Sequence, residues 1–205
     1  MAKLHVLYAL AVLVSGCAFA QDPTPSSFFP NQELRVSHLP SLAATAPNRG
    51  AAFAAALETV VNDKGVCCER DSALEDIVEY AAVASSVSLK ELSNKLQGKH
   101  HLSDGRAISV SVDYVAHAAI TPYTIIEPLR AQHAQLVEWN SHIYVMYGVL
   151  FDETRFYSGE RSYAVHKLFL IDPRFSDARR EVVFNRDTDD WDKVVGMSTI
   201  TVATQ

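Results

Sequence analysis

The stretches HIYVMYGVLF (residues 142–151) and YAVHKLFLI (residues 163–171) decide the fold of this 205-residue chain. Both are apolar runs rich in β-branched and aromatic residues, which is the composition of buried strands. The residues YSG (157–159) between them are typical of a turn, so we expect an antiparallel hairpin. Around that turn, opposed residue numbers sum to about 314, which places His142 opposite Asp172 on one face of the sheet.

The rest of the chain changes from helical to alternating periodicity at Arg106. Ser88 with Glu91 forms a capping-box pattern at the start of one predicted helix. Helices are expected at 51–61, 73–82, 88–97 and, interrupted near Pro128, 124–133. Further strands are expected at 106–113, 135–139, 181–184 and 197–203. Helices that precede strands predict an α+β fold with a mainly antiparallel sheet.

Residues 1–20 have the layout of a secretory signal peptide. Lys3 precedes an apolar run, and small residues end in AFA (18–20). The run is too short to span a membrane. Cleavage after Ala20 fits both small positions, although VSGC (14–17) also resembles a lipobox, which would make Cys17 a lipid anchor. Either interpretation predicts an exported protein, periplasmic or secreted.

The mature chain is expected to divide into two parts. Residues 21–49 are rich in proline and read as a flexible arm, and residues 50–205 are long enough for one domain with a core. The formal net charge of −6 comes with no basic stripe, which argues against a nucleic-acid partner.

No cofactor is expected, because the chain has no glycine-rich phosphate-binding loop. His100 and His101 lack a third ligand nearby, and the acidic cluster at 187–192 lacks the spacing of a calcium loop. No metal site is therefore predicted. The sequence gives no indication of oligomeric state.

The adjacent Cys67 and Cys68 follow a glycine-containing loop and open a helical pattern. A thiol at a helix start has its thiolate favoured by the helix dipole. Neighbouring cysteines can bridge only through a strained ring, so the pair is not a structural disulfide framework. Two other interpretations stay open, which are inert packing and a redox protein that cycles a Cys67–Cys68 disulfide.

The order of cysteine, strand-opening histidine and aspartate after the next strand resembles that of papain-like cysteine peptidases. WNSHIYVMYG (139–148) and LIDP (170–173) carry the likeness, which covers roughly residues 55–205 and is nearest to bacteriocin-processing peptidase domains and their extracellular relatives. The resemblance implies a helical N-terminal half that bears the cysteine helix, followed by an antiparallel sheet. It also implies a triad of Cys68, His142 and Asp172, with Asn62 as a donor to the oxyanion.

The resemblance predicts an exported cysteine peptidase or related amide hydrolase with a peptide or protein substrate. The phase of the apolar pairs at 73–74 and 77–78 favours Cys68 over Cys67 as nucleophile. Asn62 stands where the family usually has glutamine, and Glu69-Arg70 follow the thiol in place of a small residue or tryptophan. These departures leave an alternative open, which is a catalytically degenerate module that binds an extended peptide.

Overall fold

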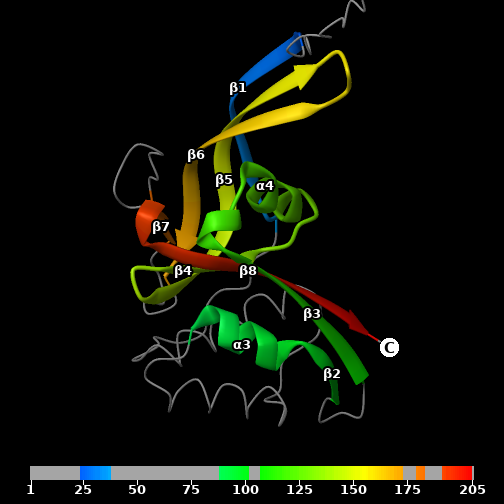
Figure 1. Cartoon of the computed structure of the whole chain (residues 1–205), viewed down its shortest axis with the longest axis vertical. Coiled ribbons are helices and arrows are strands. Elements are labelled where there is room, and N and C mark those ends of the chain that lie inside the picture. Colours follow the sequence, from blue (N-terminus) through cyan, green and yellow to red (C-terminus); the bar gives the residue numbers. More distant parts are fainter. Residues whose placement is uncertain (1–23, 38–87, 102–106, 173–178, 183–190, 205) are drawn as a thin grey trace, which may run out of the picture.

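The computed structural model describes residues 24–37, 88–101, 107–172, 179–182 and 191–204. Within these residues, eight antiparallel strands form one sheet that is accompanied by two α-helices (Figure 1). The strands are β1 (Pro25–Arg35), β2 (Gly98–His101), β3 (Ala107–Ala116), β4 (Gln135–Trp139), β5 (His142–Phe156), β6 (Arg161–Ile171), β7 (Arg179–Val182) and β8 (Val194–Thr204). The α-helices are α3 (Leu89–Leu96) and α4 (Pro122–Arg130), and short 3₁₀ turns cover His117–Ala119 and Trp191–Lys193.

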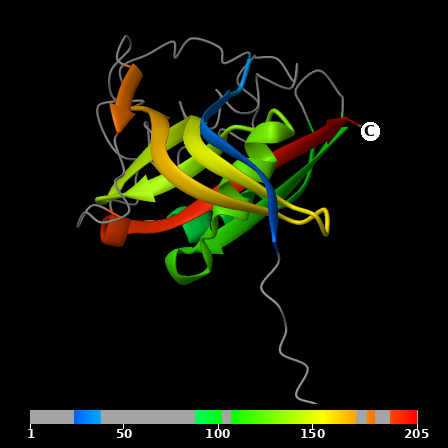
Figure 2. The same ribbon diagram turned by 90° about the horizontal axis from the view of Figure 1, so that it is seen from above.

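The sheet has the order β2-β3-β8-β4-β5-β6-β7, and β1 pairs with β5 outside this path. Strand β5 is long enough to pair with three other strands, β1, β4 and β6. Its first residues, His142–Met146, pair with β4, and its later residues, Gly148–Phe156, pair with β1. Strand β6 runs along the other edge of β5. In Figures 1 and 2, the end of the β5–β6 hairpin and the start of β1 project together beyond the rest of the curved sheet.

The hairpin predicted around residues 157–159 is confirmed. The backbone N–H of Gly159, which has a positive φ of 87°, donates to the carbonyl of Phe156. Val145 pairs with Ile171, so opposed numbers sum to 316 at that end and not to about 314. A bulge on β5 near Tyr147 and another on β6 near His166 cancel each other, so opposed numbers sum to 316 on both sides of the two bulges and to 317 between them.

The predicted papain-like organisation is wrong. The described part of the chain is mostly antiparallel strand, and its two α-helices are short and inserted among strands instead of forming a helical N-terminal half. The predicted helices at 51–61 and 73–82, together with Cys67 and Cys68, lie outside the described residues. The likeness rested on the sequence segments 139–148 and 170–173, and an apolar hairpin of this kind suits many antiparallel sheets.

Helices α3 and α4 pack on opposite faces of the sheet. The side-chain amide of Gln135 donates to the backbone carbonyl of Thr124 in α4. Three residues further along β4, the carboxylate of Glu138 accepts the backbone N–H of Leu89 in α3 at 2.8 Å. Side chains an odd number of residues apart on a regular strand point to opposite faces, so each helix covers a different face.

Helix α3 begins where the sequence predicts. The hydroxyl of Ser88 accepts the backbone N–H of Glu91, and three leucines of the helix are buried, namely Leu89, Leu92 and Leu96. Glu138 is itself buried beneath the helix start. On the same face, burial and then the charge of Glu138 raise the pKa of Tyr114.

Helix α4 begins earlier than predicted, at Pro122. Thr121 caps it in a reciprocal pair of hydrogen bonds with Thr124, and proline suits the first helical position because it has no N–H to satisfy. Pro128 lies inside the last turn and does not interrupt the helix, which ends at Arg130.

Strand β1 lies within residues 21–49, where the sequence led us to expect a flexible proline-rich arm. Most of its side chains are exposed, so it carries no alternating apolar pattern. Pro30 and Asn31, which has a positive φ of 52°, fall in an irregular stretch of its pairing with β5. Strand β2 likewise lies where no strand was predicted.

Candidate functional site

His142 is held at the start of β5 by a tight turn. Trp139 and His142 are paired residues, and Asn140 and Ser141 between them have φ values of 49° and 63°. Two consecutive residues of positive φ characterise the two-residue turn that best fits the twist of a hairpin. The turn therefore fixes where the imidazole leaves the sheet.

Asp172 directly follows β6 and is only 1% exposed. The last pair of the ladder is Val145 with Ile171, and continuing this register by one residue would place Asp172 level with Tyr144. His142 precedes Tyr144 by two residues on β5, so its side chain projects from the same face of the sheet as that of Tyr144. Diagonal neighbours of this kind lie about 7–8 Å apart between backbones, within reach of long side chains.

Aromatic rings border His142 on this face. The ring centroids of Trp139 and Tyr144 are 5.4 Å apart, and the imidazole stands edge-on to Tyr144 at 6.5 Å. Trp139, His142, Tyr144 and the position of Asp172 thus occupy one face at one end of the sheet. We call this group the histidine end.

The remaining residues of the expected triad lie outside the described residues. They are Cys68, its neighbour Cys67 and the expected oxyanion donor Asn62. Their positions relative to His142 are therefore a prediction that experiment has to test.

A second pair of histidine and carboxylate was not anticipated from the sequence, which gave no role to His166. The Nε2 atom of His166 lies 2.9 Å from Oδ2 of Asp152, whose Oδ1 accepts the backbone N–H of Asn31 at 2.8 Å. The Asn31 hydrogen bond lowers the pKa of Asp152, partial burial opposes this, and His166 lowers it further. In the sequence, only the alternation of side chains along the two strands could have indicated that Asp152 and His166 lie together. Every hairpin shows that alternation, so it does not single out this pair.

Asp152 and His166 occupy the sheet face opposite Glu153 and α4. Their contact with Asn31 joins β1 to the β5–β6 hairpin. This pair therefore has a structural use, and its histidine provides a control for His142.

His100 and His101 belong to β2, and the His100 ring contacts the carbonyl of Leu96 at the end of α3. The described residues contain no group of three or more histidine, cysteine, aspartate or glutamate side chains arranged to hold a metal ion. None of the described helices has the length and apolar character needed to cross a membrane.

No family model, curated protein or solved structure matches the chain.

Proposed function

We propose that this protein is exported and is a thiol-dependent hydrolase of peptide or related amide bonds. The observation that carries the proposal is the histidine end, where a turn-held histidine and a buried aspartate share one face of the sheet. A histidine in this setting serves as a general base when a carboxylate orients its ring.

The proposed reaction uses Cys68 as the nucleophile. Its thiolate attacks the carbonyl carbon, His142 accepts the thiol proton and returns it to the leaving amine, and Asp172 orients the imidazole. Water then hydrolyses the thioester. Asn62 and the backbone N–H of Cys68 stabilise the oxyanion, a contact worth about 3 kcal/mol in transition-state energy.

The test compares two cysteine and two histidine variants of the mature protein. Cleavage of a mixed peptide library is followed by mass spectrometry for the wild type, Cys67→Ser, Cys68→Ser, His142→Gln and His166→Gln. We expect Cys68→Ser and His142→Gln to abolish cleavage, while Cys67→Ser and His166→Gln retain most of it. If cleavage is lost in Cys67→Ser and kept in Cys68→Ser, the nucleophile is Cys67. If cleavage falls equally in His142→Gln and His166→Gln, the assignment of His142 as the general base is contradicted.

The alternative function is a peptide-binding module without catalysis. It is motivated by Glu69 and Arg70, because a carboxylate beside the thiol opposes thiolate formation. The rate of alkylation by iodoacetamide at neutral pH separates the two functions. An activated thiol reacts faster than a free cysteine, whereas a rate no faster than that, combined with peptide binding, favours the module.

A further inference from the structure

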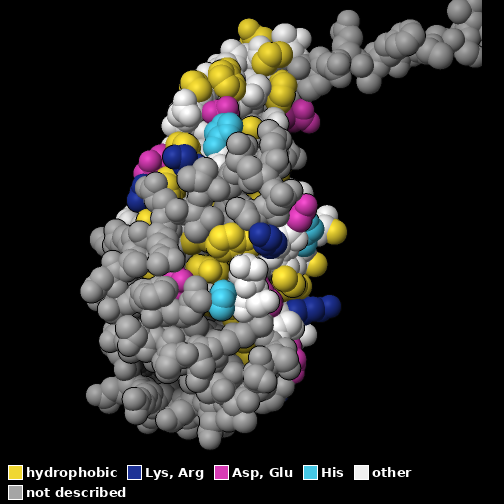
Figure 3. All heavy atoms as spheres, turned by 90° about the vertical axis from the view of Figure 1, so that its left-hand side faces the viewer, with side chains coloured by type: hydrophobic (Ala, Val, Ile, Leu, Met, Phe, Trp, Pro, Cys, Tyr) yellow, Lys and Arg dark blue, Asp and Glu magenta, His cyan; other side chains and the backbone are white. Residues whose placement is uncertain are grey.

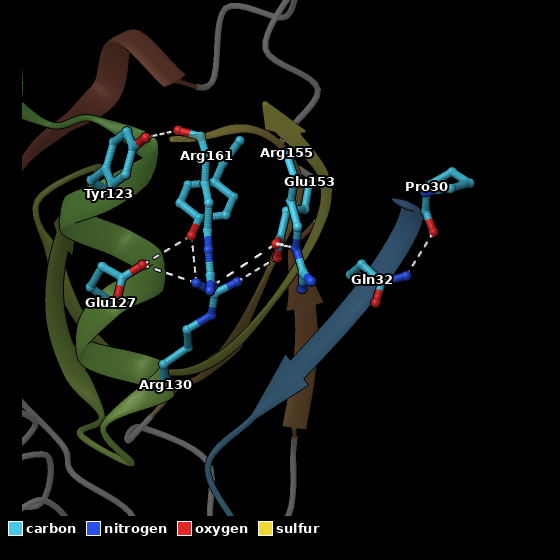
Figure 4. A network of polar contacts seen from close by, with 9 residues as sticks. Pro30, Gln32, Tyr123, Glu127, Arg130, Glu153, Arg155 and Arg161 are labelled. Carbon is cyan, nitrogen blue, oxygen red and sulfur yellow. Dashed lines mark hydrogen bonds and ion pairs between the residues drawn. The ribbon is translucent and has the colours of Figure 1, made fainter. Parts of the chain in front are cut away.

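A network of charged side chains joins α4 to the β5–β6 hairpin, at the opposite end of β5 from His142 (Figure 4). Its centre is Glu153, whose side chain is 5% exposed. Arg130 donates from Nη2 to Oε2 of Glu153 at 2.6 Å, and Arg155 donates from Nε to Oε1 at 2.5 Å. Nη1 of Arg161 lies 3.9 Å from the same Oε1.

Arg130 is fully engaged in holding the structure together. Its Nη1 donates to Glu127 at 3.0 Å and to the hydroxyl of Tyr163 at 2.5 Å. The guanidinium carbon also lies 4.9 Å from the centre of the Tyr163 ring and 5.9 Å from that of Phe151. These contacts give Arg130 a structural role.

Arg155 and Arg161 are differently placed. They are direct partners across the hairpin, and their side chains are 48% and 46% exposed. Like charges in directly opposed positions destabilise a strand pair. Within the described part of the chain, Arg161 makes no guanidinium hydrogen bond, and Arg155 uses only Nε as a donor while its carbon lies 4.6 Å from the centre of the Phe29 ring.

The charges of the network do not balance. Three guanidinium groups face the two carboxylates of Glu127 and Glu153, which leaves an excess of one positive charge. Glu160 lies beside Arg161 in sequence, but its carboxylate accepts a hydrogen bond from Ser158 in the turn. The unused donors of Arg155 and Arg161 therefore face solvent with an incomplete set of acceptors.

We propose that Arg155 and Arg161 form a binding site for an anionic group with two or more oxygens. Guanidinium groups present paired N–H donors that match a carboxylate, phosphate or sulfate, and such charge-assisted bonds are short and strong. The bound anion neutralises the excess charge and relieves the repulsion between the two arginines. Glu153 acts beneath them as the buried carboxylate that holds both side chains toward one point. The site is independent of the proposed hydrolase function, because it shares no residue with the histidine end.

The test is a titration of ¹⁵N-labelled mature protein followed by amide chemical shifts. Sodium phosphate, sodium sulfate and sodium glutarate are each exchanged for sodium chloride at constant ionic strength. We expect saturable shifts at Arg155, Arg161 and their neighbours in the hairpin, and the order of the three affinities separates a phosphate- or sulfate-type ligand from a carboxylate.

The variant Arg161→Gln should weaken this binding about tenfold or more, because hydrogen bonds to a charged group are lost. Its fold should be retained, since the half-exposed Arg161 side chain makes no hydrogen bond in the described network and its ion-pair contact with Glu153 is a long one of 3.9 Å. Arg35→Gln is the matched control, because Arg35 packs on Phe169 at 4.0 Å on another part of the sheet. Shifts that do not saturate, or that saturate equally in wild type and Arg161→Gln, would overturn the proposal.

Discussion

Glu153 is the residue whose removal should cost the hairpin most. Its carboxylate is almost fully buried and joins Arg130 of α4 to Arg155 of β5. Glu153→Gln keeps the size of the side chain but removes its charge and replaces one of the two acceptor oxygens that face Arg130 and Arg155 with an amide donor. Because both arginines retain some exposure, we expect a loss of about 2 kcal/mol in the free energy of unfolding. Urea denaturation at pH 7 measures it, with Glu160→Gln in the exposed turn as a control that should change little.

The effect of Glu153→Gln should also depend on pH. Burial opposes ionisation of Glu153, but the Arg155 hydrogen bond and the charges of Arg130, Arg155 and Arg161 hold its pKa below the ordinary 4.5. A lowered pKa in the folded state stabilises the fold above the unfolded value and loses that contribution as pH falls. The stability gap between wild type and Glu153→Gln should therefore narrow below pH 4.5. A gap that stays constant down to pH 3 would contradict this electrostatic explanation.

At the scale of residues, the sequence is informative only where a side chain departs from its local pattern. His142 opens an apolar run and Asp172 closes another, so both were identified as candidates. Glu153 and Arg155 follow the ordinary alternation of a half-exposed strand. Nothing local shows that Glu153 is buried, because its burial depends on α4 packing across the hairpin.

Strand β5 lies close to both β1 and β6 at Gly148. A Cβ atom added there would lie 2.8 Å from the backbone carbonyl oxygen of Leu34 and 2.9 Å from atoms of Arg35 and Phe169. The carbonyl belongs to the paired β1 backbone and cannot move without opening the ladder. Gly148→Ala should therefore lower the free energy of unfolding by about 1–3 kcal/mol and loosen β1.

Gly98→Ala is the matched control for this substitution. Gly98 has a φ of 138° and open space around it, so an added Cβ introduces only backbone strain. Amide hydrogen exchange distinguishes the two variants. Gly148→Ala should speed exchange in β1, while Gly98→Ala should leave β1 unchanged. Normal protection of β1 in Gly148→Ala would show that the strand tolerates the added atom.

The turn before His142 offers a stabilising substitution. Ser141 has a φ of 63°, a backbone conformation that costs an ordinary L-residue about 1–2 kcal/mol and costs glycine little. Ser141→Gly should therefore raise the free energy of unfolding by up to about 1 kcal/mol, since glycine also gains freedom in the unfolded chain. Asn140→Gly should raise the free energy of unfolding by less, because asparagine adopts a positive φ more readily than serine does. Thermal unfolding of the two variants measures the difference, and destabilisation by Ser141→Gly would contradict the expected turn strain.

At the scale of elements, periodicity predicted most of the central strands and the start of α3. It placed the start of α4 at residue 124, two residues too late, because Pro122 looks like a helix breaker. A proline in the first helical turn is in fact favourable. It missed β1 because edge strands with exposed side chains carry no apolar alternation. The hairpin register differs from the predicted one by two in the sum of opposed residue numbers, because the turn is centred on Ser158 and a sum of about 314 corresponds to a centre one residue earlier.

At the scale of the whole molecule, the alternating strands fixed the expectation of an antiparallel sheet, and that expectation is confirmed. The papain-like arrangement was inferred from the chain order of three residues, and chain order does not determine how layers pack. Long-range pairing also escaped prediction. Strand β1 joins the middle of the sheet from a position more than a hundred residues earlier in the chain, through contacts such as that of Asn31 with Asp152.

The placement of β1 leads to a prediction about the whole protein. Strand β1 covers the edge of β5 from Gly148 to Phe156, and β6 occupies the other edge. Deleting residues 24–36 would leave the backbone groups of this long edge unpaired, and such an edge recruits a strand from another chain. We expect the deletion variant to form dimers or larger species relative to the wild type in size-exclusion chromatography with light scattering. Phe28→Ser is the control, because Phe28 is 60% exposed and its replacement leaves the β1 backbone in place. A deletion variant with the same mass distribution as the wild type would show that β1 does not protect this edge.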